Sequence, residues 1–165
     1  KLVALAFGIA VLCGVLAFLA LGPVAGSVVV WAGFIALGCY FHTGGDNAAL
    51  QKTIVGMIYG AVIAGIALAL VVHNPAGLPA AIAAPVYIAV TVFFLVIVAG
   101  CNLLSVVPAN VYGYAATAGF ALSTNTAANY GAMNLTNPTL IVALSVVFGA
   151  VFGLLSGKLA GMLGI

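Results

Sequence analysis

The stretch "SVVVWAGFIALGCYFHTGG", residues 27–45, decides how the fold of this chain is interpreted. Its apolar run reaches from Ser27 to about His42, which as a helix at about 1.5 Å per residue is about 24 Å long. The hydrocarbon core of a bilayer is about 30 Å thick. The run ends in polar and glycine residues before Asp46, the only acid of the chain. The stretch therefore predicts a short membrane helix that neighbouring helices, rather than lipid, surround.

The composition excludes a water-soluble domain. Hydrophobic residues make up 67% of the 165 residues and charged residues 2%, whereas soluble proteins carry roughly a quarter charged residues. Apolar runs recur along nearly the whole length, which indicates an all-α polytopic membrane protein. At roughly 20 to 25 residues for each span with its turn, six transmembrane helices use the whole chain. We expect a single membrane domain over residues 1–165.

Interruptions between the apolar runs set the expected helix boundaries. Pro23 ends the first run, and His73-Asn74-Pro75 end the third. Polar loops are expected over 43–51 and 121–138, with a very short connection at Cys101-Asn102. The expected helices cover about 2–22, 27–42, 52–72, 80–100, 103–120 and 139–165.

The lysines indicate the orientation. With six spans, Lys1, Lys52 and Lys158 all fall on one side of the membrane. The positive-inside rule makes that side cytoplasmic, with both termini there. A re-entrant 27–42 helix would place Lys52 on the opposite side, so the lysines favour true spanning.

Two pairs of segments are similar in sequence, which suggests an internal repeat. "YGAVIAG" (59–65) parallels "FGAVFGL" (148–154), and "VVVWAGFIALGCY" parallels "SVVPANVYGYAAT", with Trp31-Ala32 near Pro108-Ala109. Three helices in each half would give the halves opposite orientations, over about 1–76 and 77–165. Inverted repeats of this kind are typical of transporters, whose solute sites lie between the halves. We expect the short 27–42 and 103–120 helices at the centre of such a 3+3 inverted repeat.

Small residues recur at every fourth position on two helices. Such rows let helix backbones approach closely in lipid, and they predict tight packing within the monomer or across a homo-oligomer. The residues expected to pack in this way are Gly56, Gly60, Gly149, Gly153, Gly157 and Gly161.

The 103–120 helix carries an unusual number of polar residues, which include Asn102 and Ser105 at its start. Asn110, Tyr114 and Thr117 share one helix face. Polar groups at membrane depth need partners or water, so this face either hydrogen-bonds to other helices or lines a path for a polar solute. Pro108, expected in the helix interior, would free the carbonyl near Leu104 for either use.

The end of the 27–42 helix is the second candidate region. Tyr40, His42 and Thr43 precede Gly44-Gly45-Asp46. His42 and Asp46 either pair, which would raise the histidine pKa, or Asp46 or Asn47 caps the next helix near its positive end; we favour the cap. Trp31 either belongs to an interfacial aromatic belt or lines a constriction.

Other classes of function find little support. Cys13, Cys39 and Cys101 lie in apolar runs without metal-site spacing, and no catalytic set or phosphate loop occurs, so we expect neither enzyme, metal nor cofactor. The net charge of +2 without basic clusters gives no reason to expect a nucleic-acid partner.

The blocks "WAGF…YF…GG" and "SVVPA…G…ATAG" resemble a known family in both order and spacing over roughly 27–119. That family of small bacterial inner-membrane proteins is numbered ten ninety-seven among the domains of unknown function. The resemblance implies a small multi-span protein of the bacterial inner membrane. It implies no substrate and no catalytic residue, and it gives no role to His42, Thr43 or Asp46.

Two hypotheses remain. The first is a channel or facilitator for a small neutral or anionic solute, such as urea, formate or a short acid, which would touch Trp31, Tyr40, His42 and the polar residues of the 103–120 helix. The second is an accessory or packing subunit of a larger membrane assembly. Proton-coupled transport is a weaker third, because coupling usually needs an acid at membrane depth and Asp46 is expected at the interface.

Overall fold

The protein is all-helical, as the sequence predicts. The structure, a computed structural model, describes residues 1–163, and in that part of the chain no strand occurs. Four helices are long and apolar enough to cross a membrane: α1, α3, α6, and α4 with the turn that follows it. The six α-helices are α1 (Leu2–Leu21), α2 (Val30–His42), α3 (Asn47–His73), α4 (Ala80–Ile97), α5 (Val107–Ser123) and α6 (Pro138–Met162).

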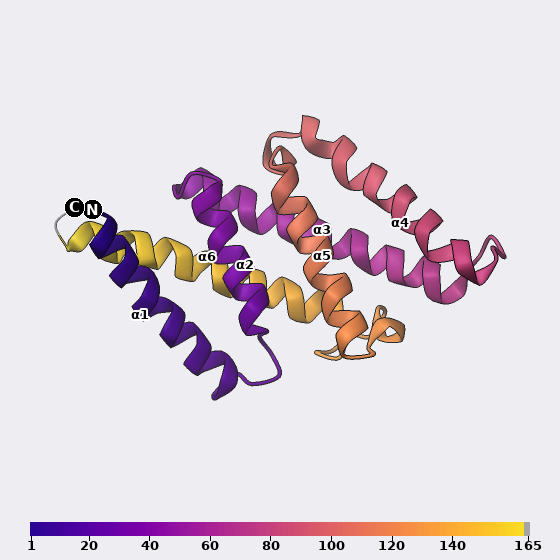
Figure 1. The fold of residues 1–165 in the computed structure, drawn as a ribbon, viewed down its shortest axis with the longest axis horizontal. Helices are drawn as coiled ribbons and strands as arrows, with labels where there is room; N and C mark the ends of the chain where they lie inside the picture. The colour runs from indigo at the N-terminus through magenta and orange to yellow at the C-terminus, as the bar shows by residue number, and fades with distance from the viewer. Residues whose placement is uncertain (164–165) are drawn as a thin grey trace.

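The two longest helices, α3 and α6, form the centre of the molecule (Figure 1). Helices α1 and α2 pack on α6, and α4 and α5 pack on α3. Helices α2 and α6 run in the same direction. Val29, before the start of α2, contacts Ser145, and Tyr40, near its end, contacts Gly153 further along α6. Helices α5 and α3 likewise run in the same direction. The turns at 43–46 and 98–106 therefore share one side of the bundle with the two chain ends.

Side-chain caps fix the ends of the central helices. The Asp46 carboxylate accepts a hydrogen bond from the Ala49 backbone N–H at 2.7 Å and begins α3. Asn74 ends α3 in the left-handed conformation, at φ 44°, which asparagine tolerates better than most residues. Asn137 caps α6 by accepting from the Thr139 N–H. The expected start of the third helix near Lys52 was therefore wrong by a turn, because the cap is Asp46.

The two short helices also differ from their expected boundaries. Helix α2 begins at Val30 rather than Ser27, and α5 covers Val107–Ser123 rather than 103–120. Two 3₁₀ turns, η1 (Val98–Gly100) and η2 (Asn102–Leu104), replace the expected direct connection. Pro108 consequently lies in the first turn of α5, where no intrahelical bond is lost. The expectation that Pro108 interrupts a helix interior was wrong.

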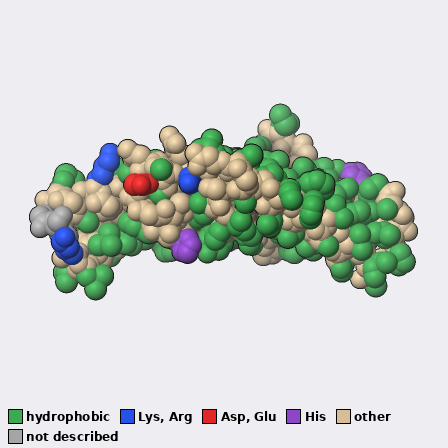
Figure 2. Space-filling model, turned by 90° about the horizontal axis from the view of Figure 1, so that it is seen from above, with side chains coloured by type: hydrophobic (Ala, Val, Ile, Leu, Met, Phe, Trp, Pro, Cys, Tyr) green, Lys and Arg blue, Asp and Glu red, His purple; other side chains and the backbone are tan. Residues whose placement is uncertain are grey.

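The charged residues gather toward one end of the molecule. Figure 2 shows the lysine and acid groups in one part of the face it draws, and mostly apolar side chains over the rest. Lys1 lies beside Gly157 and Gly161 in the last turns of α6, next to Lys158. Lys52 lies in the second turn of α3, which starts from the same side. We call this the lysine side of the bundle.

The core consists mainly of small residues. Ala36, Met57, Ala61, Val142 and Val146 belong to one cluster of buried side chains where α2, α3, α5 and α6 meet. Many large apolar side chains face outward instead, such as Phe7, Phe18 and Phe93. This arrangement suits a protein whose solvent is lipid and whose helices pack through small residues.

Candidate functional site

Asn110 is one of two fully buried polar residues of α5. Its side chain is fully inaccessible. The Nδ2 group donates to the backbone oxygens of Leu95, at 3.2 Å, and Leu104, at 3.1 Å. These carbonyls lie at the end of α4 and in η2, where regular helical bonding stops. Asn110 therefore holds the irregular connection between α4 and α5 against the start of α5.

The backbone and the Oδ1 atom of Asn110 pack against glycines of α3. A Cβ atom built on Gly60 would lie 1.9 Å from the Asn110 backbone oxygen, and one on Gly56 would lie 2.8 Å from Asn110 Oδ1. In the reverse direction, a Cβ on Gly113 would lie 1.9 Å from the Met57 oxygen. The backbones of α3 and α5 thus touch, which small-residue interfaces permit in membranes.

A matching crossing joins α2 to α6. A Cβ on Gly149 would lie 1.9 Å from the Gly33 oxygen, and a Cβ on Gly153 would lie 2.8 Å from the Tyr40 ring. Gly157 is looser, with Tyr40 and Phe41 atoms 3.9 and 4.0 Å from an added Cβ. Gly161 has no described atom within 4 Å of that position. Of the six glycines, Gly56, Gly60, Gly149 and Gly153 therefore lie at close crossings within the monomer.

Tyr114 and Thr117, the other two residues of the polar face of α5, differ from Asn110 in their hydrogen bonding. The Tyr114 hydroxyl is 3.0 Å from Thr91 Oγ1 of α4, and Thr91 also donates to the Tyr87 oxygen at 2.8 Å. Thr117 is fully buried. Within the described residues, neither Thr117 Oγ1 nor Asn110 Oδ1 has a hydrogen-bond partner. Buried polar atoms without partners are rare in proteins and call for an explanation.

The polar residues at the end of α2 form a second group, separate from the polar face of α5. The Tyr40 hydroxyl donates to the Gly45 oxygen, and its ring packs into the notch at Gly153. His42 is exposed, and no ion pair between it and Asp46 occurs in the part of the chain that the structure describes. Asp46 instead caps α3, so the capping interpretation describes this end of the helix.

The structure brings together some of the predicted solute-contacting residues and separates others. Asn110, Tyr114 and Thr117 follow one another along the inner part of α5. Asn102 and Ser105 lie exposed on the lysine side, where Ser105 Oγ donates to the Asn102 oxygen at 2.7 Å. Trp31 is on the outer surface of α2, 42% exposed. The set therefore forms no single pocket.

Sequence reasoning missed the polar role of Ser145. Its hydroxyl accepts from the Val29 N–H at 2.8 Å and donates to the Ile141 oxygen at 2.7 Å. The start of α2 has no capping side chain of its own. Ser145 of α6 takes that role. The available signal was its position four residues before Gly149, in line with the row of glycines on α6.

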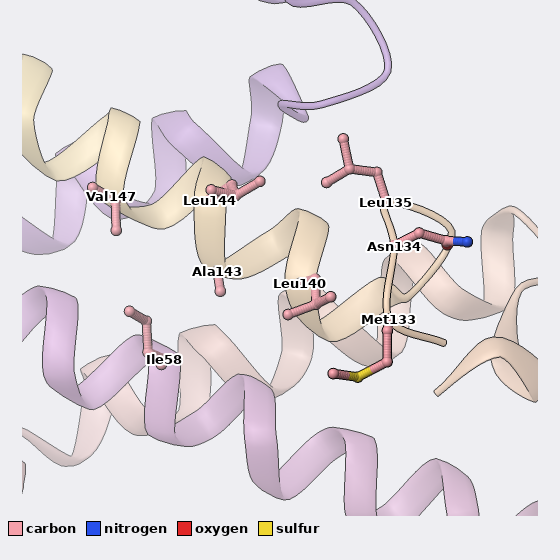
Figure 3. Close-up of a pocket in the computed structure, with 8 residues that line it drawn as sticks. All are labelled: Ile58, Met133, Asn134, Leu135, Leu140, Ala143, Leu144 and Val147. Atoms are coloured by element: carbon pink, nitrogen blue, oxygen red, sulfur yellow. The ribbon is translucent and has the colours of Figure 1, made fainter. Parts of the chain in front are cut away.

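Two hollows of the molecule are largely apolar. Figure 3 shows a groove of about 480 Å³ beside α6 and the loop before it, in which all eight lining side chains except Asn134 are hydrocarbon or thioether groups. Met133 of this loop is 96% exposed. A smaller cavity of about 150 Å³ lies between α3, α4 and α5. No cluster of three metal-ligating side chains occurs among the described residues.

Comparison with known proteins gives one match. A family model described as a protein of unknown function (DUF1097) matches residues 6–161. No curated protein and no solved structure matches the chain.

Proposed function

The chain belongs to the DUF1097 family, and from that premise we propose that it is a membrane channel or facilitator for a small polar solute. The observation that carries the proposal is the pair of buried, unpartnered atoms on α5, Asn110 Oδ1 and Thr117 Oγ1. The two residues are seven positions apart on one helix face, a rise of about 10 Å. A solute or water that passes along this face would supply the missing hydrogen bonds.

The proposal includes an inverted repeat, with α2 and α5 as equivalent central helices. Two equivalent crossings support it. Gly60 of α3 meets the oxygen of Asn110, and Gly149 of α6 meets the oxygen of Gly33. In the sequence comparison, Gly60 corresponds to Gly149 and Asn110 corresponds to Gly33, so equivalent positions meet at the two crossings between the halves. Solute sites of inverted-repeat proteins lie between the halves.

A neutral or anionic solute fits the charges best. Asp46 is the only acid of the chain, and its carboxylate is engaged in capping α3. Neither helix α2 nor α5 carries an acid that would bind a cation at membrane depth. Passive permeation is therefore favoured over coupling to protons or sodium ions, and we assign no enzymatic activity and no cofactor.

The membrane and its sides follow from the same proposal. The family resemblance implies the bacterial inner membrane, and the positive-inside rule places the lysine side in the cytoplasm. A homo-oligomer is expected, because the apolar surfaces of α3 and α6 beside the groove of Figure 3 are free in the monomer. Oligomer size by native mass spectrometry tests this part.

The glycine rows no longer favour the accessory-subunit hypothesis. Gly56, Gly60, Gly149 and Gly153 contact helices of the same chain, so these small residues are not available to a partner protein. Native mass spectrometry after mild detergent extraction separates the two functions. A stable complex with another protein would favour the accessory role, and a homo-oligomer would favour the channel.

Flux measurements test the channel directly. Protein reconstituted into liposomes should increase permeability to at least one solute of a panel that contains urea, formate and short carboxylic acids. An imposed proton gradient should not drive accumulation, and the Asp46→Asn variant should keep the flux of the wild type. An absence of flux across the panel contradicts the channel, and gradient-driven uptake that Asp46→Asn abolishes establishes coupled transport instead.

A further inference from the structure

The cavity between α3, α4 and α5 is hollow because small side chains meet there. Its volume is about 150 Å³. Five of its lining residues, from three α-helices and the turn η3 (Ala127–Asn129), are alanines: Ala64, Ala67, Ala84, Ala118 and Ala127. Leu122, which is 69% exposed, also lines it, as do the half-exposed Val72 and Ile88, so the cavity opens to the outer surface of the bundle.

The chemistry of the lining is apolar. Tyr114 contributes the one hydroxyl group near the cavity, and that hydroxyl is already hydrogen-bonded to Thr91 at 3.0 Å. No charged side chain lines it. An enclosed apolar cavity of about this volume accepts a benzene-sized molecule. Size and polarity therefore both fit a small uncharged hydrocarbon group.

The crossing of α2 with α6 shows what fills the equivalent position. Under the inverted repeat proposed above, Ala118 and Ala64 correspond to Phe41 and Gly153. At that second crossing the Tyr40 ring lies against Gly153, and the Phe41 ring lies 4.0 Å from a Cβ built on Gly157. The α2–α6 crossing is thus filled with aromatic rings, and the α3–α5 crossing has Thr117 and Ala118 at the equivalent positions.

We propose that the α3–α4–α5 cavity is a binding site for a small uncharged aromatic molecule, whose ring takes the place that the Phe41 ring has at the α2–α6 crossing. The comparison of halves rests on the proposed repeat, whereas the volume and lining do not. Of the polar face of α5 only Tyr114 lines the site, and the two residues with unpartnered atoms, Asn110 and Thr117, do not.

Binding of fluorobenzene, followed by ¹⁹F NMR, tests the site. The full chain is placed in nanodiscs of phosphatidylcholine and phosphatidylglycerol, and empty nanodiscs give the non-saturable partitioning. The variant Ala118→Phe fills the cavity from within. Ala115→Phe is the matched control, because Ala115 is an exposed residue of the same helix.

Wild type and Ala115→Phe should show equal saturable binding, and Ala118→Phe should weaken it at least tenfold and raise the thermal midpoint. If Ala118→Phe aggregates, Ala118→Leu gives the same comparison with a smaller group. Equal binding by wild type and the folded Ala118 variant overturns the site. So does the absence of saturable binding by wild type, which would mean that a lipid acyl chain occupies the cavity. These outcomes are independent of solute flux, which is measured with other variants.

Discussion

The backbone oxygen of Asn110 lies only 1.9 Å from the place that a Cβ atom on Gly60 would take. Gly149 and the oxygen of Gly33 have the same relationship at the other crossing. Two pairs of helices, α3 with α5 and α2 with α6, are therefore held at backbone contact. In this fold the short helices are positioned by the long ones, and glycine is required at each crossing.

Gly60→Ala should destabilise the protein strongly. The added methyl group meets a backbone atom, which cannot move as a side chain can, so we expect a loss of about 3 kcal/mol or failure to fold. Thermal unfolding in detergent, followed by size-exclusion chromatography, measures the effect. Gly38→Ala is the control, because Gly38 lies in α2 with no described atom within 4 Å of an added Cβ. Equal stability of the two variants would contradict the close crossing.

Asn110→Ala should loosen the connection between α4 and α5. The change removes both hydrogen bonds of Nδ2 and leaves the carbonyls of Leu95 and Leu104 without that donor, at a cost of about 1–3 kcal/mol for each buried group. Hydrogen exchange should accelerate over residues 98–107 more than over the α2–α3 turn. Uniform acceleration along the chain would show that Asn110 has no such local role.

Ser145→Ala should affect the start of a helix that is distant in sequence. The Val29 N–H loses its acceptor, so amide exchange should increase around residues 28–33. Ser156→Ala serves as the control on the same helix, because the Ser156 hydroxyl bonds only to the Phe152 oxygen four residues earlier. Similar exchange at 28–33 in both variants would argue against the cap.

Asp46→Ala should lower stability by about 1 kcal/mol through loss of the α3 cap, whereas Asp46→Asn keeps an acceptor oxygen and should cost less. Thermal midpoints of the two variants against wild type measure the difference. Equal losses would indicate that the charge of Asp46, rather than its hydrogen bond to Ala49, stabilises the start of α3.

The sequence predicts the helical class, the six helices and the family, because apolar periodicity and composition depend on local residues. It misplaces the start of α3 by a turn, since residues 47–51 were assigned to the loop although Asp46 was already favoured as the cap. It also misplaces Pro108, because the turns η1 and η2 are stabilised by Asn110 from six residues or more away. Long-range bonds of this kind leave no periodic signal.

The polar residues of α5 likewise combine features that the local sequence predicts with features that depend on the folded chain. The shared face of Asn110, Tyr114 and Thr117 follows from helix geometry alone. Which of their atoms find partners depends on α4, whose Thr91 and Leu95 engage Tyr114 and Asn110 and leave Thr117 Oγ1 without a bond in the described residues. The cavity at Ala118 likewise depends on three helices and a turn that meet only in the folded chain.

The most direct test of the proposed channel is solute flux through Thr117→Val. Valine keeps the shape of threonine and removes only the hydroxyl group. Thr53→Val is the matched control, because Thr53 is also fully buried but its hydroxyl bonds to Cys39. We predict that Thr117→Val lowers liposome permeability about three- to tenfold, as expected for the loss of a hydrogen bond worth about 1 kcal/mol, whereas Thr53→Val does not. Undiminished flux in folded Thr117→Val would contradict a solute path along α5.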